Sequence, residues 1–396
     1  MNIDKKGISM ITVALAVALV VVIIAAAAYI AVNSGKTSTV TTTVTETSAV
    51  PTYYSLTLQA GGSTFVNPVM QVWAHGFGLY TNNAVQTNYQ AVGSGAGITG
   101  ILTGTFEFAG SDAPVSTSQS ANYTTVKGPL LQIPETLGGV AIFYNVPGVT
   151  VSLNLTGSVL ADIYLGNITM WNNPAIAALN PGCHAGSTTC VLPADTITPV
   201  HRSDGSGTTY ALTNYFEKVS TAWNASFSGG CPCYGTSISW PSSEIGAKGS
   251  SGVAAYVNEN PNTIGYADSY YALANGLKAA AIQNQAGVFL APTLTDIAAA
   301  ANAFSAQVQA NPTFTITNAP GAGSYPISTF TYLLVWANQT NQQQGYDTAQ
   351  LFEWIVNQGQ AFGPSLNYPA LPANVVAIDQ SLIQQIKYNG VPFIQA

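Results

Sequence analysis

From residue 56 to the end of the chain, segments with two different patterns of apolar and polar positions alternate. Short runs with period-two or continuous apolar character predict strands, and longer runs with apolar residues spaced near 3.6 predict helices. The expected strands, with the loops they enter, cover 56–62, 84–93, 106–114, 138–148, 197–207 and 326–338, and the expected helices cover 63–80, 93–105, 155–171, 208–219, 294–308, 347–362 and 381–388. Ser63 or Thr64 is the expected N-cap of the first helix. This alternation predicts an α/β fold with mainly parallel strand pairing.

Residues 7–35 carry no charged side chain, and this run is long enough to cross a bilayer as a helix. Lys5 and Lys6 precede it, which favours an amino terminus inside the cell and the rest of the chain outside. The run is too long for the apolar part of an ordinary signal peptide. We expect residues 1–35 to be an uncleaved anchor or a retained helix like that of archaeal prepilins, whose processing site the junction resembles. The alternative is that processing removes this helix completely from the mature protein.

Residues 36–51 are rich in Thr and Ser, and a tract of this composition cannot bury a core. We expect a stalk over residues 36–55, with or without O-linked sugar. Asn-x-Ser/Thr sequons further along the chain suit an exported glycoprotein, although a chain rich in Asn and Thr produces some by chance. They lie at Asn122, Asn154, Asn167, Asn224 and Asn338.

The chain is unusually poor in charge. Apolar residues make up 47% and charged residues 6%, against about 25% charged in ordinary soluble domains. Nine basic residues and a net charge of −7 argue against a nucleic-acid partner, because binding to phosphate backbones needs clustered Lys and Arg. The polar surface must therefore consist mainly of uncharged side chains.

The four cysteines predict two disulfides in an extracellular compartment, with three possible connectivities. Closure within each pair and a bridge between the two cysteine loops both fit the spacing. A zinc site with His184 as an additional ligand is the competing interpretation, but it requires thiolates to persist in an oxidising compartment. The candidates are Cys183, Cys190, Cys231 and Cys233.

Three strand-to-helix junctions place small residues and hydroxyls ahead of a helix. They are Gly62-Ser63-Thr64-Phe65, Gly93-Ser94-Gly95-Ala96-Gly97 and Gly205-Ser206-Gly207-Thr208. The first backbone N–H groups of a helix lack intrahelical partners and the helix dipole is positive there, so such junctions can bind anions. One such junction is usually only an N-cap, whereas three in one chain indicate an anion site.

Arg202 is the only arginine of the chain and precedes the third junction. Its planar guanidinium can make two parallel hydrogen bonds to a tetrahedral oxyanion. An ion pair with Asp204 at the surface is the alternative interpretation. A sole arginine beside a glycine-flanked hydroxyl cluster favours the ligand role, with Asp204 holding the guanidinium from behind.

Eight segments carry a family resemblance. They read AGGSTFVNPV, NYQAVGSGAG, FEFAGSDAPVS, ETLGGVAIFYNVPG, LADIYLGNITMWNNPAIAALNPG, HRSDGSGTTYALTNYF, SGVAAYVNENPNTIGYADSYYA and YPISTFTYLLV. In their order and spacing, across about residues 56–390, they resemble the extracytoplasmic phosphate-binding protein of phosphate ABC transporters. The anchor helix, the depletion of charge and the two cysteine loops depart from the family pattern.

The resemblance implies an α/β, two-domain, periplasmic-binding-protein-like (type II) fold with a hinge, preceded by one N-terminal transmembrane helix. The first domain would comprise residues 56–145 and 326–396, and the second residues 146–325. In this family the anion is held without water in the cleft between the domains, and the domains close on it. The protein would pass inorganic phosphate to a permease and an ATPase encoded elsewhere, without a cofactor, a metal or catalysis.

The same resemblance implies the contacts to phosphate. They are the Thr64 hydroxyl, the Phe65 N–H, Ser94, Asp112, Arg202, Ser206, the Gly207 N–H and Thr208. Asp112 is a carboxylate in an anion site, which needs an explanation. Phosphate near neutral pH still carries a hydrogen that it can donate to Asp112, whereas sulfate does not, so Asp112 would reject sulfate. In acidic medium Asp112 could itself be protonated and act as a donor.

Other functions fit the sequence less well. His201, Asp204 and Ser206 suggest a hydrolase triad, but triad members are normally brought together by folding, and the G-x-S-x-G elbow is missing. The glycine run at 93–97 lacks the acid that a dinucleotide site needs at a strand end. A binding protein for sulfate, molybdate or another tetrahedral oxyanion, and a pilus-like structural subunit of the surface, stay open as alternatives.

Overall fold

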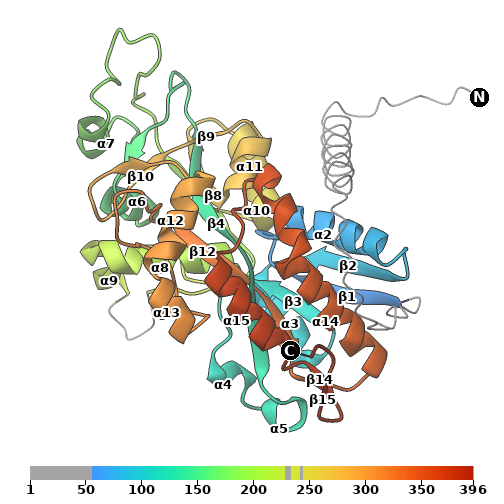
Figure 1. Cartoon of the computed structure of the whole chain (residues 1–396). Coiled ribbons are helices and arrows are strands. Elements are labelled where there is room, and N and C mark those ends of the chain that lie inside the picture. The colour runs from blue at the N-terminus through green and yellow to red at the C-terminus, as the bar shows by residue number, and fades with distance from the viewer. Residues whose placement is uncertain (1–55, 228–232, 241–243, 396) are drawn as a thin grey trace, which may run out of the picture. The chain divides into compact units, whose positions relative to one another are not determined.

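The computed structural model describes residues 56–227, 233–240 and 244–395 (Figure 1). These residues belong to one compact unit, Tyr53–Ala396. The predicted anchor over 1–35, the stalk over 36–55 and Cys231 lie outside the described residues. Within the described ranges, no helix is both long and apolar enough to cross a membrane.

A nine-stranded mixed sheet forms the centre of the fold, in the order β2-β1-β3-β12-β4-β8-β6-β7, with β9 also paired to β4. Its strands are β1 (Leu56–Gly62), β2 (Val85–Ala91), β3 (Phe108–Ser111), β4 (Leu130–Asn145), β6 (Thr198–Arg202), β7 (Ile245–Ala247), β8 (Thr263–Asp268), β9 (Lys278–Ala279) and β12 (Ser328–Trp336). Two small sheets join β5 (Asn154–Leu155), β10 (Ala281–Gln283) and β11 (Phe289–Leu290), and β13 (Asn338–Gln339), β14 (Lys387–Tyr388) and β15 (Val391–Pro392).

The long strand β4 connects two sides of the sheet. Its first part pairs with β12, from Leu130 opposite Trp336 to Gly139 opposite Ser328. Its second part pairs with β8, from Val140 opposite Asp268 onward. We call the strands β1, β2 and β3 with their helices the β1 side, and the strands β6, β7 and β8 with theirs the β6 side. The domain limits implied by the family resemblance stay a prediction.

The expectation of mainly parallel pairing is wrong for the middle of the sheet. Strand β1 is parallel to β2 and β3, and β6 is parallel to β7 and β8. In contrast, β12 is antiparallel to β3 and β4, and β4 is antiparallel to β8. The chain leaves the β1 side along β4 and returns along β12, so these two neighbours must run in opposite directions.

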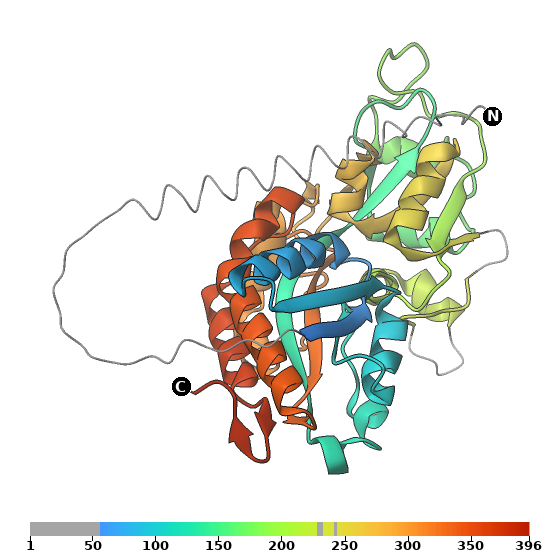
Figure 2. The same cartoon turned by 90° about the vertical axis from the view of Figure 1, so that its right-hand side faces the viewer.

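Helices cover the sheet (Figures 1 and 2). They are α2 (Asn67–Tyr80), α3 (Ser94–Thr103), α4 (Thr117–Ser120), α5 (Thr124–Lys127), α6 (Gly157–Tyr164), α7 (Pro174–Leu179), α8 (Gly207–Val219), α9 (Thr221–Ser226), α10 (Gly249–Glu259), α11 (Ser269–Ala274), α12 (Leu294–Ala303), α13 (Ser305–Ala310), α14 (Gln342–Val356), α15 (Ala373–Ile383) and a 3₁₀ helix (Gln358–Leu366). Helix α2 buries one apolar stripe, including Trp73 and Phe77, and Phe77 contacts Trp354 of α14 with ring centroids 6.0 Å apart.

Several predicted boundaries are wrong for identifiable reasons. Helix α2 begins after Val66 rather than after Ser63 or Thr64, and Pro68 stands in its first turn, where proline is favoured. The helix expected over 155–171 ends at Tyr164, just before Gly166 adopts a φ of 74°. The helix expected over 381–388 is instead the end of α15, and its last residues form strand β14.

Candidate functional site

The three predicted junctions meet where parallel strands end. Strands β1, β3 and β6 deliver Thr64, Asp112 and Arg202 to this place, and helices α3 and α8 begin there. The Gly95 N–H of α3 donates to the Gly205 carbonyl oxygen over 2.9 Å, which joins the second junction to the third. The junctions therefore face one another from the β1 side and the β6 side.

The polar side chains at this place are almost completely buried. Thr64 is 6% exposed and Arg202 4%, and the remaining members of the group are 2% exposed or less. We call the group the junction cluster. It comprises Thr64, Ser94, Asp112, Arg202, Ser206 and Thr208. Burial of this many polar groups costs free energy unless they find partners, so the partners define what the cluster can do.

Arg202 is held flat by Asp204. Its Nε–H donates to Asp204 Oδ1 over 2.8 Å, and its Nη2 forms an ion pair with Asp204 Oδ2. The Gly249 N–H donates to Asp204 Oδ1 over 2.9 Å. Although burial acts to raise the pKa of Asp204, the hydrogen bonds and the charge of Arg202 outweigh it and lower that pKa below its ordinary value. Asp204 is therefore a carboxylate that fixes the plane of the guanidinium.

Asp112 lies opposite, on the loop after β3. It accepts hydrogen bonds from the Ser63 hydroxyl and, over 3.4 Å, from the Thr208 hydroxyl, which comes from the β6 side. Burial raises the pKa of Asp112 to about 6, although the Ser63 bond, the charge of Arg202 and the Thr208 bond act to lower it. A Cβ at Gly207 would lie 2.6 Å from the Asp112 Cβ, so this close approach requires glycine.

The other predicted ligands have partners inside the protein. The Asp112 N–H donates to the Ser94 hydroxyl oxygen over 3.3 Å, which leaves the Ser94 hydrogen available. The Ser206 hydroxyl oxygen accepts from the Thr209 N–H and caps α8. The Phe65 N–H donates to the Ser63 hydroxyl over 3.0 Å. The structure thus brings all the predicted residues together, with the Phe65 N–H engaged locally.

Sequence reasoning named Ser63 in the first junction but missed its contact with Asp112, and it did not single out Gly249 or Ser250. Ser63 donates to Asp112, and Ser250 contacts both Thr64 and Arg202. The run Gly249-Ser250-Ser251-Gly252 opens α10 in the same way as the second and third junctions open α3 and α8. That repeated design was a signal that could have identified Ser250.

His201, Cys183, Cys190 and Cys233 do not belong to the cluster. The His201 ring stacks on Trp240 with centroids 5.2 Å apart, and burial lowers its pKa. Cys183 and Cys190 form a disulfide, so closure within this pair is confirmed over the bridge between loops. Cys233 forms no disulfide within the part of the chain that the structure describes.

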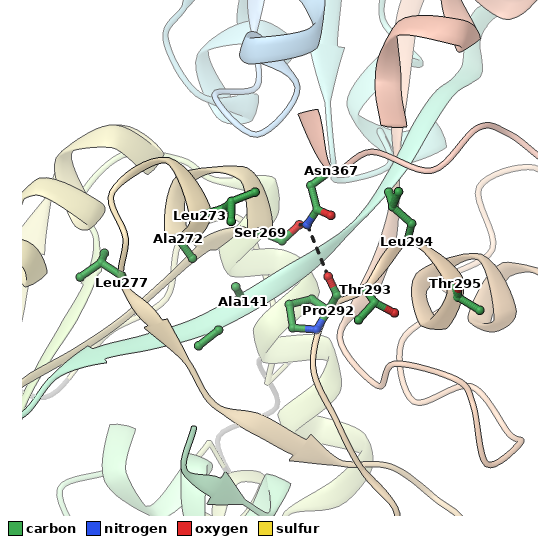
Figure 3. A pocket seen from close by; sticks show the side chains of 11 residues that line it. Ala141, Ser269, Ala272, Leu273, Leu277, Pro292, Thr293, Leu294, Thr295 and Asn367 are labelled. Atoms are coloured by element: carbon green, nitrogen blue, oxygen red, sulfur yellow. Dashed lines mark hydrogen bonds between the residues drawn. The ribbon is translucent and has the colours of Figure 1, made fainter. Parts of the chain in front are cut away.

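A separate surface pocket of about 480 Å³ lies beside α11 and the start of α12 (Figure 3). It is lined mainly by apolar side chains such as Leu273 and Leu294, and Asn367 also lines it. Asn367 donates to the Ser269 hydroxyl over 2.7 Å. No member of the junction cluster lines this pocket.

Comparisons with known proteins agree with this geometry. A family model described as a PBP superfamily domain matches residues 33–357. The "Phosphate-binding protein PstS" of Xylella fastidiosa (strain Temecula1) is 37% identical over 323 residues, which cover 81% of this chain and 83% of the relative. The protein of the same name from Methanocaldococcus jannaschii is 32% identical over 352 residues, covering 84% and 87%.

Solved structures share the fold. A phosphate-binding protein from Stenotrophomonas maltophilia matches with a TM-score of 0.61 and 18% identity, covering 82% of this chain and 93% of that one. The structure of a high affinity periplasmic phosphate-binding protein, PfluDING, bound with phosphate matches with a TM-score of 0.62 and 22% identity, also covering 82% of this chain and 93% of that one. The α/β periplasmic-binding-protein-like fold predicted from the sequence is therefore confirmed.

Proposed function

The chain belongs to the family of phosphate-binding proteins of the PBP superfamily, and from this premise we propose that it captures inorganic phosphate at the junction cluster for delivery to an ABC permease. The observation that carries the proposal is the buried guanidinium of Arg202, held by Asp204 beside the junctions that open α3 and α8. A buried positive charge among hydroxyl groups suits a ligand of opposite charge.

The donors of the cluster suit a tetrahedral anion. A guanidinium has five N–H groups, and contacts to Asp204 and Ser250 use three of them within the described residues. Two N–H groups of Arg202 stay available for anion oxygens. The Ser94 hydroxyl and the first N–H groups of α8 add further donors at the positive end of a helix dipole.

Asp112 supports phosphate over fully deprotonated anions. It is an acceptor among donors, and above its pKa of about 6 it can accept the hydrogen that phosphate carries. Sulfate at the same place would set two charged oxygens against each other without a hydrogen between them. We therefore propose phosphate, rather than sulfate or molybdate, as the ligand.

Isothermal titration calorimetry of the full chain with phosphate, arsenate and sulfate tests the function. Phosphate is expected to bind with one-to-one stoichiometry, arsenate to compete because it also carries a hydrogen near neutral pH, and sulfate to give no heat at the same concentrations. Lys278→Ala removes one exposed positive charge elsewhere and should bind like the wild type. Absence of phosphate binding, or equal binding of sulfate, would contradict the proposal.

We further propose that the protein works on the extracellular face of the cell membrane, held there by residues 1–35, and that it binds without turnover. The uncharged run 7–35 and the export-type disulfide support this place. Sequons Asn122, Asn167 and Asn224 are exposed and suit glycosylation there. The full chain should stay with membranes after alkaline carbonate extraction and a variant lacking residues 1–35 should not; release of both would refute the anchor.

A further inference from the structure

Ser250 lies where both sides of the sheet meet the junction cluster. It is the second residue of α10 and is 0% exposed. Its hydroxyl oxygen lies 3.0 Å from the Thr64 hydroxyl oxygen and 3.4 Å from Arg202 Nη1. Its backbone N–H donates to the same Thr64 oxygen over 3.1 Å. Ser250 therefore contacts Thr64 from the β1 side and Arg202 from the β6 side at once.

The chemistry of these groups favours one direction for the hydrogen bonds. A guanidinium can only donate, so the Ser250 hydroxyl oxygen accepts from Arg202. The contact at 3.4 Å is long, but the effect of a full positive charge falls only gradually with distance in a buried site. This charge makes the Ser250 hydroxyl a better donor and a poorer acceptor. The Ser250 hydrogen then points to Thr64.

This direction decides what Thr64 can do. The Thr64 oxygen accepts from the Ser250 N–H and from the Ser250 hydroxyl, which uses its two lone pairs. Its own single hydrogen is then left for a third partner. In the opposite direction Thr64 would spend that hydrogen on Ser250 and would have none for a ligand.

We propose that Ser250 is a positioning residue, which turns the hydroxyl hydrogen of Thr64 toward the bound anion by relaying the charge of Arg202. The inference rests on the proposed function, because it concerns how the same site holds phosphate. Gly249 supports the arrangement from the residue before. Its N–H donates to Asp204, and its φ of 71° places α10 against Thr64.

Phosphate affinity of Ser250→Ala, measured by calorimetry, is the first test. We expect affinity to fall about tenfold, the size of one hydrogen bond to a charged ligand. Ser251→Ala is the matched control, because Ser251 is the exposed neighbour of Ser250 on the first turn of α10. The phosphate affinity of Ser251→Ala should differ from that of the wild type by less than about twofold. Ser250→Gly, which also lacks the hydroxyl, should repeat the loss if Ser250→Ala folds poorly.

A double-mutant cycle separates positioning from mere packing. If Ser250 acts through Thr64, then Ser250→Ala should have less than about a twofold effect on phosphate affinity in a Thr64→Val background. An undiminished tenfold effect in that background, or wild-type affinity of Ser250→Ala and Ser250→Gly, would overturn the inference. Failure of the wild type to bind phosphate would instead overturn the proposed function.

Discussion

Asp204 beside the junction cluster and Glu135 in the core are both largely shielded carboxyl groups, yet their surroundings are opposite. Asp204 accepts from the Arg202 guanidinium and the Gly249 N–H, and its pKa is lowered. Glu135 lies on β4, is 0% exposed and accepts from the Thr331 hydroxyl over 2.9 Å. Burial raises the pKa of Glu135 to about 8, the Thr331 bond lowers it and the charge of Asp112 raises it.

The comparison shows how a chain with few charges distributes them. Arg202 and Asp204 form the one ion pair found within the described residues, and it serves the site. Both carboxyl oxygens of Asp379 and the Oδ1 of Asp347 are buried without a hydrogen-bond partner there, whereas Asp347 Oδ2 accepts from Gln343, and burial raises the pKa of both groups. A charged pair is thus kept where the two partners compensate each other, whereas burial without a charged partner raises the pKa of these acids.

Asp268 is a further buried acid close to the site. The Tyr368 hydroxyl donates to the Phe65 carbonyl oxygen over 2.6 Å and to Asp268 Oδ1 over 3.0 Å, so two acceptors share one hydrogen. Burial, chiefly, raises the pKa of Asp268 well above its ordinary value, although the bond from Tyr368 acts to lower it.

The largest effect is expected from Arg202→Ala, which removes the compensated charge. It leaves Asp204 and Asp112 in a buried site without a cation, so phosphate affinity should fall by at least about 100- to 1,000-fold. Calorimetry with phosphate measures the loss, and Lys278→Ala controls for the change in net charge. An Arg202→Ala variant that keeps the wild-type affinity for phosphate would show that the Arg202–Asp204 pair does not serve the phosphate site.

The second effect concerns the pH dependence of stability. A carboxyl whose pKa rises from 4.5 to about 8 on folding stabilises the protein fully below pH 4.5, and this contribution is lost as pH rises to about 8. Glu135→Gln should therefore melt near the wild-type temperature at pH 4 and above it at pH 8.5. Glu259→Gln, at an exposed position, should follow the wild type at both pH values. If the melting temperature of Glu135→Gln differs from that of the wild type by the same amount at both pH values, Glu135 is not neutral in the folded protein.

The smallest effect is expected at Asp112, whose pKa of about 6 lies between those two cases. Asp112→Asn offers sulfate a donor, so the ratio of phosphate to sulfate affinity should fall at least about tenfold at pH 7. In the wild type the ratio of phosphate to sulfate affinity should fall when the pH is lowered from 7 to 3, because Asp112 gains a proton and becomes a donor. Competition binding measures both, and a ratio that stays constant across this range would speak against the acceptor role.

Local signals made much of this site predictable. Glycines and hydroxyls ahead of helices marked the junctions of Thr64, Ser94 and Ser206, and the lone Arg202 drew attention to the third. These features depend on a few adjacent residues, which a sequence displays directly. The charged partner Asp204 was found for the same reason.

The remaining features depend on contacts between distant segments. The Ser63 hydroxyl turns to Asp112, 49 positions later, and so does not cap a helix. Ser250 meets Thr64 across 186 positions. The first half of β4 escaped prediction because Pro134 and Glu135 interrupt its apolar run, and only the pairing with β12 reveals a buried strand. Tertiary contacts override local preference at each of these places.

A crystal structure, determined from crystals grown in the presence of phosphate, would test the central claim most directly. The account predicts one phosphate inside the junction cluster, with oxygens within hydrogen-bond distance of the Arg202 guanidinium, the Thr64 hydroxyl and the Gly207 N–H, and with one oxygen facing Asp112. Phosphate bound elsewhere, or an Arg202 side chain that points away from it, would contradict the account.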